Sequence, residues 1–151
     1  MRALVVYGAP YESTRLVAGY VADGLRATHM VTVVPVAGVT ADLLAGTDLL
    51  VVGGPTHLRG LSSGIQELVK VPQSWPVLAA AFDTRTSGGP AVPGRSSRSI
   101  TRLLKRHGYL IIVTPESFGV TAQGTPLDGE AARARHWGAA LGIISTFAHA
   151  A

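Results

Sequence analysis

The chain has 151 residues, a length that fits one domain with a full hydrophobic core, and we expect residues 1–151 to form that domain. It contains no cysteine, which excludes disulfides, thiolate metal sites and cysteine nucleophiles. The formal net charge of +4 permits an acidic partner without requiring one. No apolar run approaches the ~18 residues of a membrane span, and the amino terminus runs straight into an apolar segment. We therefore expect a soluble cytoplasmic protein with no membrane partner.

Short apolar runs predict strands, and the segments between them have the spacing of amphipathic helices. The predicted strands are residues 2–7, 31–35, 48–53, 77–82 and 109–113. The predicted helices are residues 14–25, 40–44 and 65–69, one around 98–106, and a last helix with Asp128 as its N-cap. The residues expected to turn toward the core from this last helix are Ala134, Trp137, Leu141 and Ile144.

Strands that alternate with helices predict a single α/β domain with a parallel sheet covered on both faces. Right-handed crossovers leave few topologies, and the five-stranded order 2-1-3-4-5 in a three-layer sandwich is the leading one. In this topology the loops after the first, third and fourth strands meet at one edge of the sheet. Open α/β sheets bind their ligands at that edge.

The loop after the first strand, from Gly8 to Thr14, leads into the amino terminus of a helix. Free N–H groups and a partial positive charge at such a terminus attract an anion, and Ser13 and Thr14 add hydroxyl donors. The alternative is that Ser13 only caps the helix. Neither G-x-G-x-x-G nor G-x-x-x-x-G-K-[ST] occurs after this strand, so a dinucleotide fingerprint and a Walker loop are both unsupported.

The other two loops also carry polar side chains. The third predicted strand runs out of apolar residues at Gly53 and Gly54 and breaks into the loop that contains His57. The fourth opens at Asp83 into a glycine- and proline-rich loop that reaches residue 94. Alternative interpretations remain open: His57 could be a solvated loop histidine, and Asp83 could form a local ion pair with Arg85.

Several segments resemble one family. The residues Ala-Leu-Val-Val-Tyr7, a hydroxyl-rich turn and Thr14-Arg15 look like the start of flavodoxins. The segment Asp48-Leu-Leu-Val-Val-Gly-Gly-Pro-Thr-His57 is similar to the segment that flanks the flavin in flavodoxin-like proteins, and the resemblance covers nearly the whole chain. It implies a flavodoxin-like fold that binds FMN for electron transfer or as a small flavin reductase. The implied FMN-binding residues are Ser13, Thr14, Pro55, Thr56, His57, Leu58, Arg59, Asp83, Thr84 and Arg85.

The resemblance places the FMN phosphate in the first loop and the isoalloxazine between the second and third. The first loop departs from the family pattern: Ala9 replaces a hydroxyl, Glu12 replaces glycine, and Pro10 has no N–H to donate. The Glu12 carboxylate would repel a phosphate unless it points into solvent or Arg15 neutralises it. Two alternatives therefore stay open, a fold that holds no FMN and serves as a protein-interaction module, and a flavin analogue with a different tail.

A run from Thr84 to Pro115 contains no acidic residue. Its helical part places four cations on one side: Arg98, Arg102, Lys105 and Arg106. Such a stripe is usually a solvated face, and the functional alternative is that it docks a redox partner or another acidic protein. Interleaved aromatic residues and known nucleic-acid motifs are absent, so we do not expect nucleic-acid binding. The histidines show no metal-ligand spacing.

Overall fold

The computed structural model describes residues 1–8, 12–55, 63–73, 75–86 and 95–150. Its strands are β1 (Arg2–Tyr7), β2 (Met30–Pro35), β3 (Leu49–Pro55), β4 (Leu78–Thr86), β5 (Leu110–Ile111) and β6 (Glu116–Val120). Its helices are α1 (Glu12–Leu25), α2 (Ala41–Ala45), α3 (Ser63–Val69), α4 (Arg95–Arg106) and α5 (Glu130–Ala150), with a 3-10 turn η1 (Val36–Gly38). In this described part of the chain no helix is both long and apolar enough to cross a membrane.

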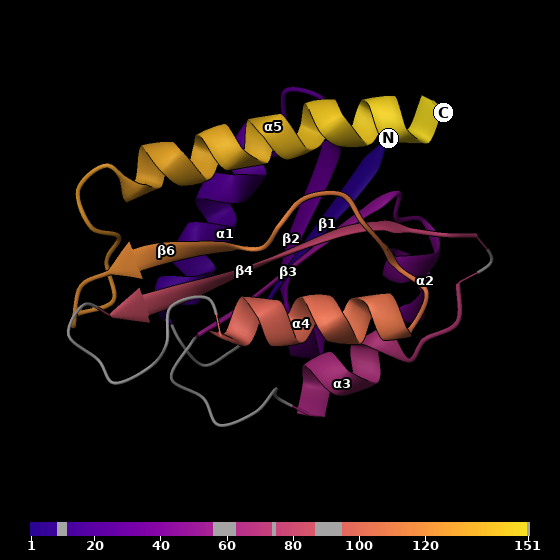
Figure 1. Ribbon diagram of the computed structural model, residues 1–151, viewed down its shortest axis with the longest axis horizontal. Coiled ribbons are helices and arrows are strands. Elements are labelled where there is room, and N and C mark those ends of the chain that lie inside the picture. The colour runs from indigo at the N-terminus through magenta and orange to yellow at the C-terminus, as the bar shows by residue number, and fades with distance from the viewer. Residues whose placement is uncertain (9–11, 56–62, 74, 87–94, 151) are drawn as a thin grey trace.

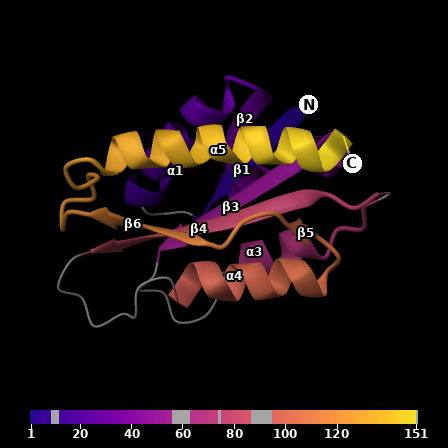
Figure 2. The ribbon, with the colours of Figure 1, turned by 45° about the horizontal axis from the view of Figure 1, so that its top comes forward.

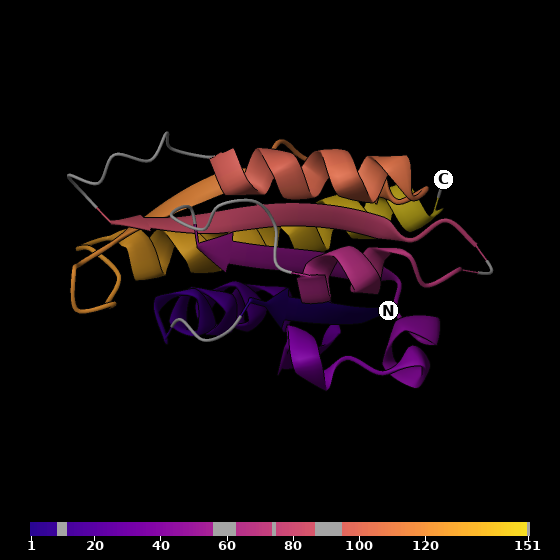
Figure 3. The ribbon, with the colours of Figure 1, turned by 90° about the horizontal axis from the view of Figure 1, so that it is seen from below.

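The sheet has the order β2-β1-β3-β4-β5 with all pairs parallel, as the sequence predicts. Figure 1 shows α1 and α5 on one side of the sheet and α3 and α4 on the other. Figure 3 shows the same three layers from below, with α2 beside α3. The predicted single α/β domain with a three-layer sandwich is therefore confirmed.

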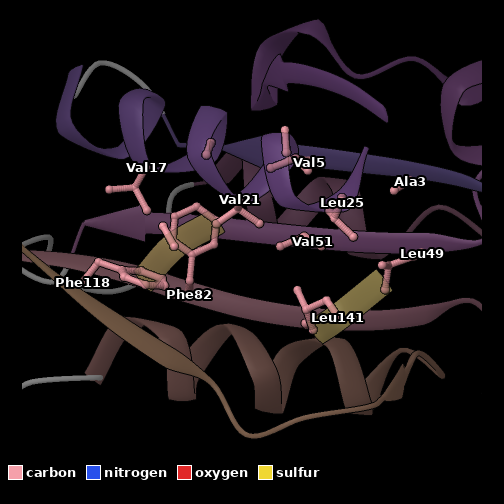
Figure 4. Close-up of a cluster of buried hydrophobic side chains, with 14 of the residues drawn as sticks. Ala3, Val5, Val17, Val21, Leu25, Leu49, Val51, Phe82, Phe118 and Leu141 are labelled. Atoms are coloured by element: carbon pink, nitrogen blue, oxygen red, sulfur yellow. The ribbon is translucent and has the colours of Figure 1, made fainter. Parts of the chain in front are cut away.

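Two hydrophobic clusters fill the space on either side of the sheet. Alternate residues of each strand belong to different clusters: Val5 and Val51 pack toward α1 and α5, whereas Val6 and Val52 pack toward the opposite layer. Figure 4 shows the first cluster, in which Phe82 lies among the strand and helix side chains. Because both faces are covered, the central strands are nearly continuous apolar runs.

The last edge of the sheet differs from the prediction. The strand predicted at 109–113 is wrong in extent, because β5 has only two residues and a sixth strand, β6, follows it along β4 (Figure 2). Ala79 pairs with Ile111 and Phe82 with Glu116, so residues 80–81 of β4 lie opposite residues 112–115 of the edge chain. The two extra residues form a bulge, and Pro115, which cannot donate to the ladder, lies in it.

The fourth strand is longer than the sequence predicts. β4 continues to Thr86, so Asp83, Thr84 and Arg85 lie in a strand and not in a loop. The reason is pairing on both sides: Gly54 and Pro55 of β3 pair with Asp83 and Thr84, and Glu116 to Val120 of β6 pair with residues 82–86 of β4. The polar end of β4 therefore pairs with β6. The sequence did not reveal β6 as a strand because its first residues are polar.

Helix α5 packs against α1 more closely than the hydrophobic pattern of its sequence suggests. It begins at Glu130 after Gly129, whose φ is +83°, so the prediction of Asp128 as N-cap is wrong. Ala134 and Leu141 are fully buried and Trp137 packs against the cluster, as expected, but Ile144 is 37% exposed. The remaining buried positions of α5 are the small residues Gly138, Gly142 and Ser145.

The small residues are required by the close approach of α1 and α5. A Cβ added at Gly138 would lie 2.1 Å from the carbonyl oxygen of Val21, and one at Gly24 would lie 2.0 Å from that of Arg135. Both obstacles are backbone atoms, which cannot rotate away. The two helices therefore touch backbone to backbone at this crossing.

We expect Gly138→Ala to lower the free energy of unfolding by about 3 kcal/mol, because the new methyl group must push two helices apart. Gly19→Ala in α1 is the matched control, since no heavy atom lies within 4 Å of its added Cβ. That control should raise stability by about 0.5–1 kcal/mol through helix propensity. Urea unfolding followed by circular dichroism measures both values, and equal effects of the two substitutions would contradict the described crossing.

Candidate functional site

The carboxyl ends of β1, β3 and β4 meet at one edge of the sheet, which we call the carboxyl edge. Tyr7, the last residue of β1, pairs with Gly53; β3 continues to Pro55, which pairs with Thr84, and β4 continues to Thr86. The backbone N–H of Gly8 donates to the carbonyl oxygen of Gly53 at 2.9 Å and keeps the chain against β3 as it leaves β1. Helix α1 begins four residues later, at Glu12. The predicted convergence is confirmed for these described strand ends.

The residues predicted to bind a ligand fall into two groups. Thr56, His57, Leu58 and Arg59 lie outside the described residues. The described ones lie at the carboxyl edge: Ser13 and Thr14 in the first turn of α1, Pro55 at the end of β3, and Asp83, Thr84 and Arg85 in β4.

Two of the predicted site residues contact each other. The hydroxyl oxygens of Thr14 and Thr84 are 3.1 Å apart and share a hydrogen bond in which either can donate. Both residues are buried, with 0% and 2% of their surfaces exposed. This bond fastens the first turn of α1 to β4, so the helix amino terminus is held at the edge of the sheet.

Asp83 is buried completely, and both of its carboxylate oxygens accept hydrogen bonds. The backbone N–H of Ser97, in the first turn of α4, donates to Oδ2 at 2.9 Å, and the hydroxyl of Ser117 in β6 donates to Oδ1 at 2.6 Å. In the described part of the chain Asp83 forms no ion pair with Arg85. The carboxylate therefore joins β4 to α4 and β6, a role that depends on two serines for which the sequence showed no distinguishing signal.

The carboxylate of Glu12 at the start of α1 does not stand alone. Arg15 donates from Nε to one carboxylate oxygen at 3.0 Å and from a terminal nitrogen to the other oxygen. The contact between the two side chains is therefore bidentate. The hydrogen bond from Arg15 lowers the pKa of Glu12, so the carboxylate remains charged and paired at neutral pH. Both side chains are more than half exposed. The neutralisation of Glu12 by Arg15, one of the conditions named for a phosphate at this turn, is met.

A fourth segment reaches the carboxyl edge, and the sequence analysis missed it. The chain between β6 and α5 forms a closed turn, in which the N–H of Thr121 donates to the carbonyl oxygen of Thr125 at 2.7 Å. Gly124 within it has a φ of +89°, and a Cβ there would lie 3.8 Å from the backbone nitrogen of Ser13. The signal available in the sequence was the Gly-Thr pair, which is typical of a tight turn.

Arg133 holds the end of β6 against the start of α5. Its guanidinium donates to Glu130 at 2.7 Å and to Glu116 at 2.6 Å, and lies 4.4 Å from the ring centre of Phe118. The other oxygen of Glu130 accepts from the backbone N–H of Gly119 at 2.7 Å. These bonds raise the pKa of Arg133 and lower that of Glu130, so both stay charged. The network fixes the place from which the 121–125 turn starts.

Arg85 supplies a cation at the carboxyl edge. It is partly buried, and its buried Nε has no hydrogen-bond partner among the residues that the structure describes. A buried donor without a partner is uncommon, and an acceptor brought to it would remove the cost. The described residues contain no cluster of three or more side chains that could hold a metal ion. A partly buried cation beside a helix amino terminus is the kind of environment that favours an anion.

No protein-family model matches the chain, and no curated protein is similar to it in sequence. Solved structures do match. A flavodoxin from the domain Archaea superposes with a TM-score of 0.80 and 18% identity, over 97% of this chain and 99% of that one. Flavodoxin 2 from Bacillus cereus has a TM-score of 0.71 and 14% identity, over 97% and 99% of the two chains.

A larger protein contains the same architecture as one part. Rubredoxin oxygen:oxidoreductase from Desulfovibrio gigas matches with a TM-score of 0.77 and 18% identity, over 99% of this chain and 37% of that one. At such low identity these matches concern the arrangement of the backbone alone.

We expect Asp83→Asn to lower the free energy of unfolding by about 2–3 kcal/mol, because an amide cannot accept from both Ser97 and Ser117. Asp42→Asn, at an exposed position of α2, should change it by less than about 0.5 kcal/mol. Urea unfolding of both variants gives the comparison. If Asp83→Asn were as stable as the control, the carboxylate would not be the tie between β4, α4 and β6.

Proposed function

We propose that this chain, which has a flavodoxin-like fold, binds FMN at the carboxyl edge and acts in electron transfer or small flavin-dependent redox chemistry. The observation that carries the proposal is the convergence of three parallel strand ends with the first turn of α1, which is 14 residues long. A helix of this length offers an anion its free N–H groups and its partial positive charge. We keep the predicted cytoplasmic location as part of the same proposal.

The described residues fit the phosphate end of FMN. Ser13 and Thr14 lie in the first turn of α1, and the ion pair with Arg15 removes most of the repulsion that Glu12 would otherwise exert. Arg85 adds a cation whose Nε has no hydrogen-bond partner in the described part of the chain. The hydroxyl of Ser13 and the backbone N–H groups of Ser13 and Thr14 would hold the phosphate, since the Thr14 hydroxyl bonds to Thr84. Residues 55–59 with Thr84 and Arg85 would flank the ring. Bound FMN would supply the redox chemistry, while the protein orients it and sets the local charge.

A second candidate function is a protein-interaction module that holds no FMN. The observation that favours it is internal satisfaction of the polar groups: Thr14 bonds to Thr84, and Asp83 bonds to α4 and β6 without any ligand. A site built only for FMN would leave more of these groups free. The departures at Ala9, Pro10 and Glu12 support the same candidate.

The two candidates are separated by a titration. The protein is purified under native conditions, its visible spectrum is recorded, and FMN is then added while flavin fluorescence is followed. A flavin band, or quenching that saturates at micromolar FMN or below, supports the first candidate. Without either, the double variant Ala9→Ser with Glu12→Gly should create FMN binding if the second candidate is right. Riboflavin, titrated alongside, tests whether a flavin without the phosphate is preferred.

We expect Glu12→Gln to lower the Kd for FMN roughly fivefold, because it removes a carboxylate beside the phosphate and frees the charge of Arg15. Asp23→Asn is the matched control, since Asp23 pairs with Arg26 at the same spacing but near the other end of α1. It should leave the Kd unchanged. The same fluorescence titration measures both, and an equal response of the two variants would contradict binding of the phosphate at the start of α1.

A further inference from the structure

Outside α4, most cations on or directly after a helix have a carboxylate three residues before them. Arg15 pairs with Glu12, Arg26 with Asp23, Lys70 with Glu67 and Arg133 with Glu130, all within hydrogen-bonding reach. These local pairs leave little net field on the surfaces that carry them. The arrangement recurs in or directly after α1, α3 and α5, and so describes how this chain treats cations on the helices other than α4.

Helix α4 departs from this rule. Arg98, Arg102, Lys105 and Arg106 are all exposed, and none of them pairs with a carboxylate in the part of the chain that the structure describes. Their positions place Arg98 and Arg102, and again Arg102 and Arg106, four residues apart on one side of the helix. Like charges at this spacing repel each other and destabilise a helix slightly. The positive charge of α4 is therefore not balanced by carboxylates, and it slightly lowers the stability of the free protein.

The cations are held on a firm support. The opposite side of α4 is buried, with Ile100 and Leu104 fully covered against the sheet and Ser97 and Thr101 almost so. The first turn is tied down by the bond between the Ser97 N–H and Asp83. The stripe therefore points away from the core along a helix of about 18 Å that cannot turn to hide it.

We infer that the exposed side of α4 is a docking surface for an acidic face of a partner protein. Four unpaired cations on one rigid helix match a carboxylate-rich surface, and complementary charge speeds and orients such an encounter. The helix sequence contains no aromatic residue to stack on bases, so a nucleic-acid strand fits it less well. Because the first turn of α4 is bonded to Asp83, a partner docked at that end of the helix would lie beside the carboxyl edge. That the partner is a redox protein rests on the proposed function.

The experiment uses a fluorescein-labelled peptide of ten glutamates as the probe, with binding followed by anisotropy at low and physiological salt. The variant R98Q/R102Q removes two cations of α4. The matched control R26Q/R135Q removes two cations elsewhere, both close to Asp23, and lowers the net charge equally. We expect the peptide to bind the α4 variant roughly tenfold more weakly than wild type and the control within about twofold of it.

Two results would overturn the inference. One is an equal loss of peptide binding in both double variants, or no peptide binding to wild type at low salt. The other is binding of a labelled decathymidylate to wild type at least as tight as that of the peptide, which would show a general polyanion surface. FMN titration of the same variants keeps the proposals apart: failure of wild type to bind FMN removes the proposed function and leaves the result on α4 intact.

Discussion

The buried carboxylate of Asp83 is the constraint on which the carboxyl edge depends. A charged group without water must find donors inside the protein, and Asp83 finds them in the α4 backbone and in a hydroxyl of β6. The next residue, Thr84, bonds to Thr14 of α1 in the opposite layer. Two consecutive residues of one strand thus fix the starting points of helices on both faces of the sheet. β4 therefore ties both helical layers to this edge of the sheet.

The strand order could be predicted because five apolar runs alternate with helical spacing, and parallel crossovers leave few arrangements. The end of β4 could not, since Asp83 to Arg85 are polar and their strand conformation depends on pairing with the ends of β3 and β6. Core positions of α5 were also mispredicted where size mattered more than hydrophobicity. Ile144 looks like a core residue, yet Gly138 and Ser145 occupy the interface, because backbone contact with α1 excludes larger side chains. Serines and turns that complete the edge carry no periodic signal.

The proposed FMN site and the proposed docking surface adjoin each other at the amino terminus of α4. The edge that we propose for FMN requires anion-attracting groups, and the chain supplies helix N–H groups and Arg85 while neutralising Glu12 locally. The docking surface instead requires cations that have no carboxylate partner. Among the helices whose cations are described, α4 alone provides them. Surfaces on which cations pair with nearby carboxylates are therefore close to neutral, whereas the exposed side of α4 is positive.

The bulge between β5 and β6 has a consequence for how molecules of this protein behave at high concentration. An uninterrupted edge strand offers a row of free N–H and C=O groups to which a strand of another molecule can add. Along β4 that outer row is divided into pieces of two and five residues by the segment that contains Pro115. The longer piece is anchored by Arg133, through Glu116 and the carbonyl oxygen of Ser117. The irregularity that hid β6 in the sequence thus disfavours addition of a second molecule's strand at this edge of the sheet.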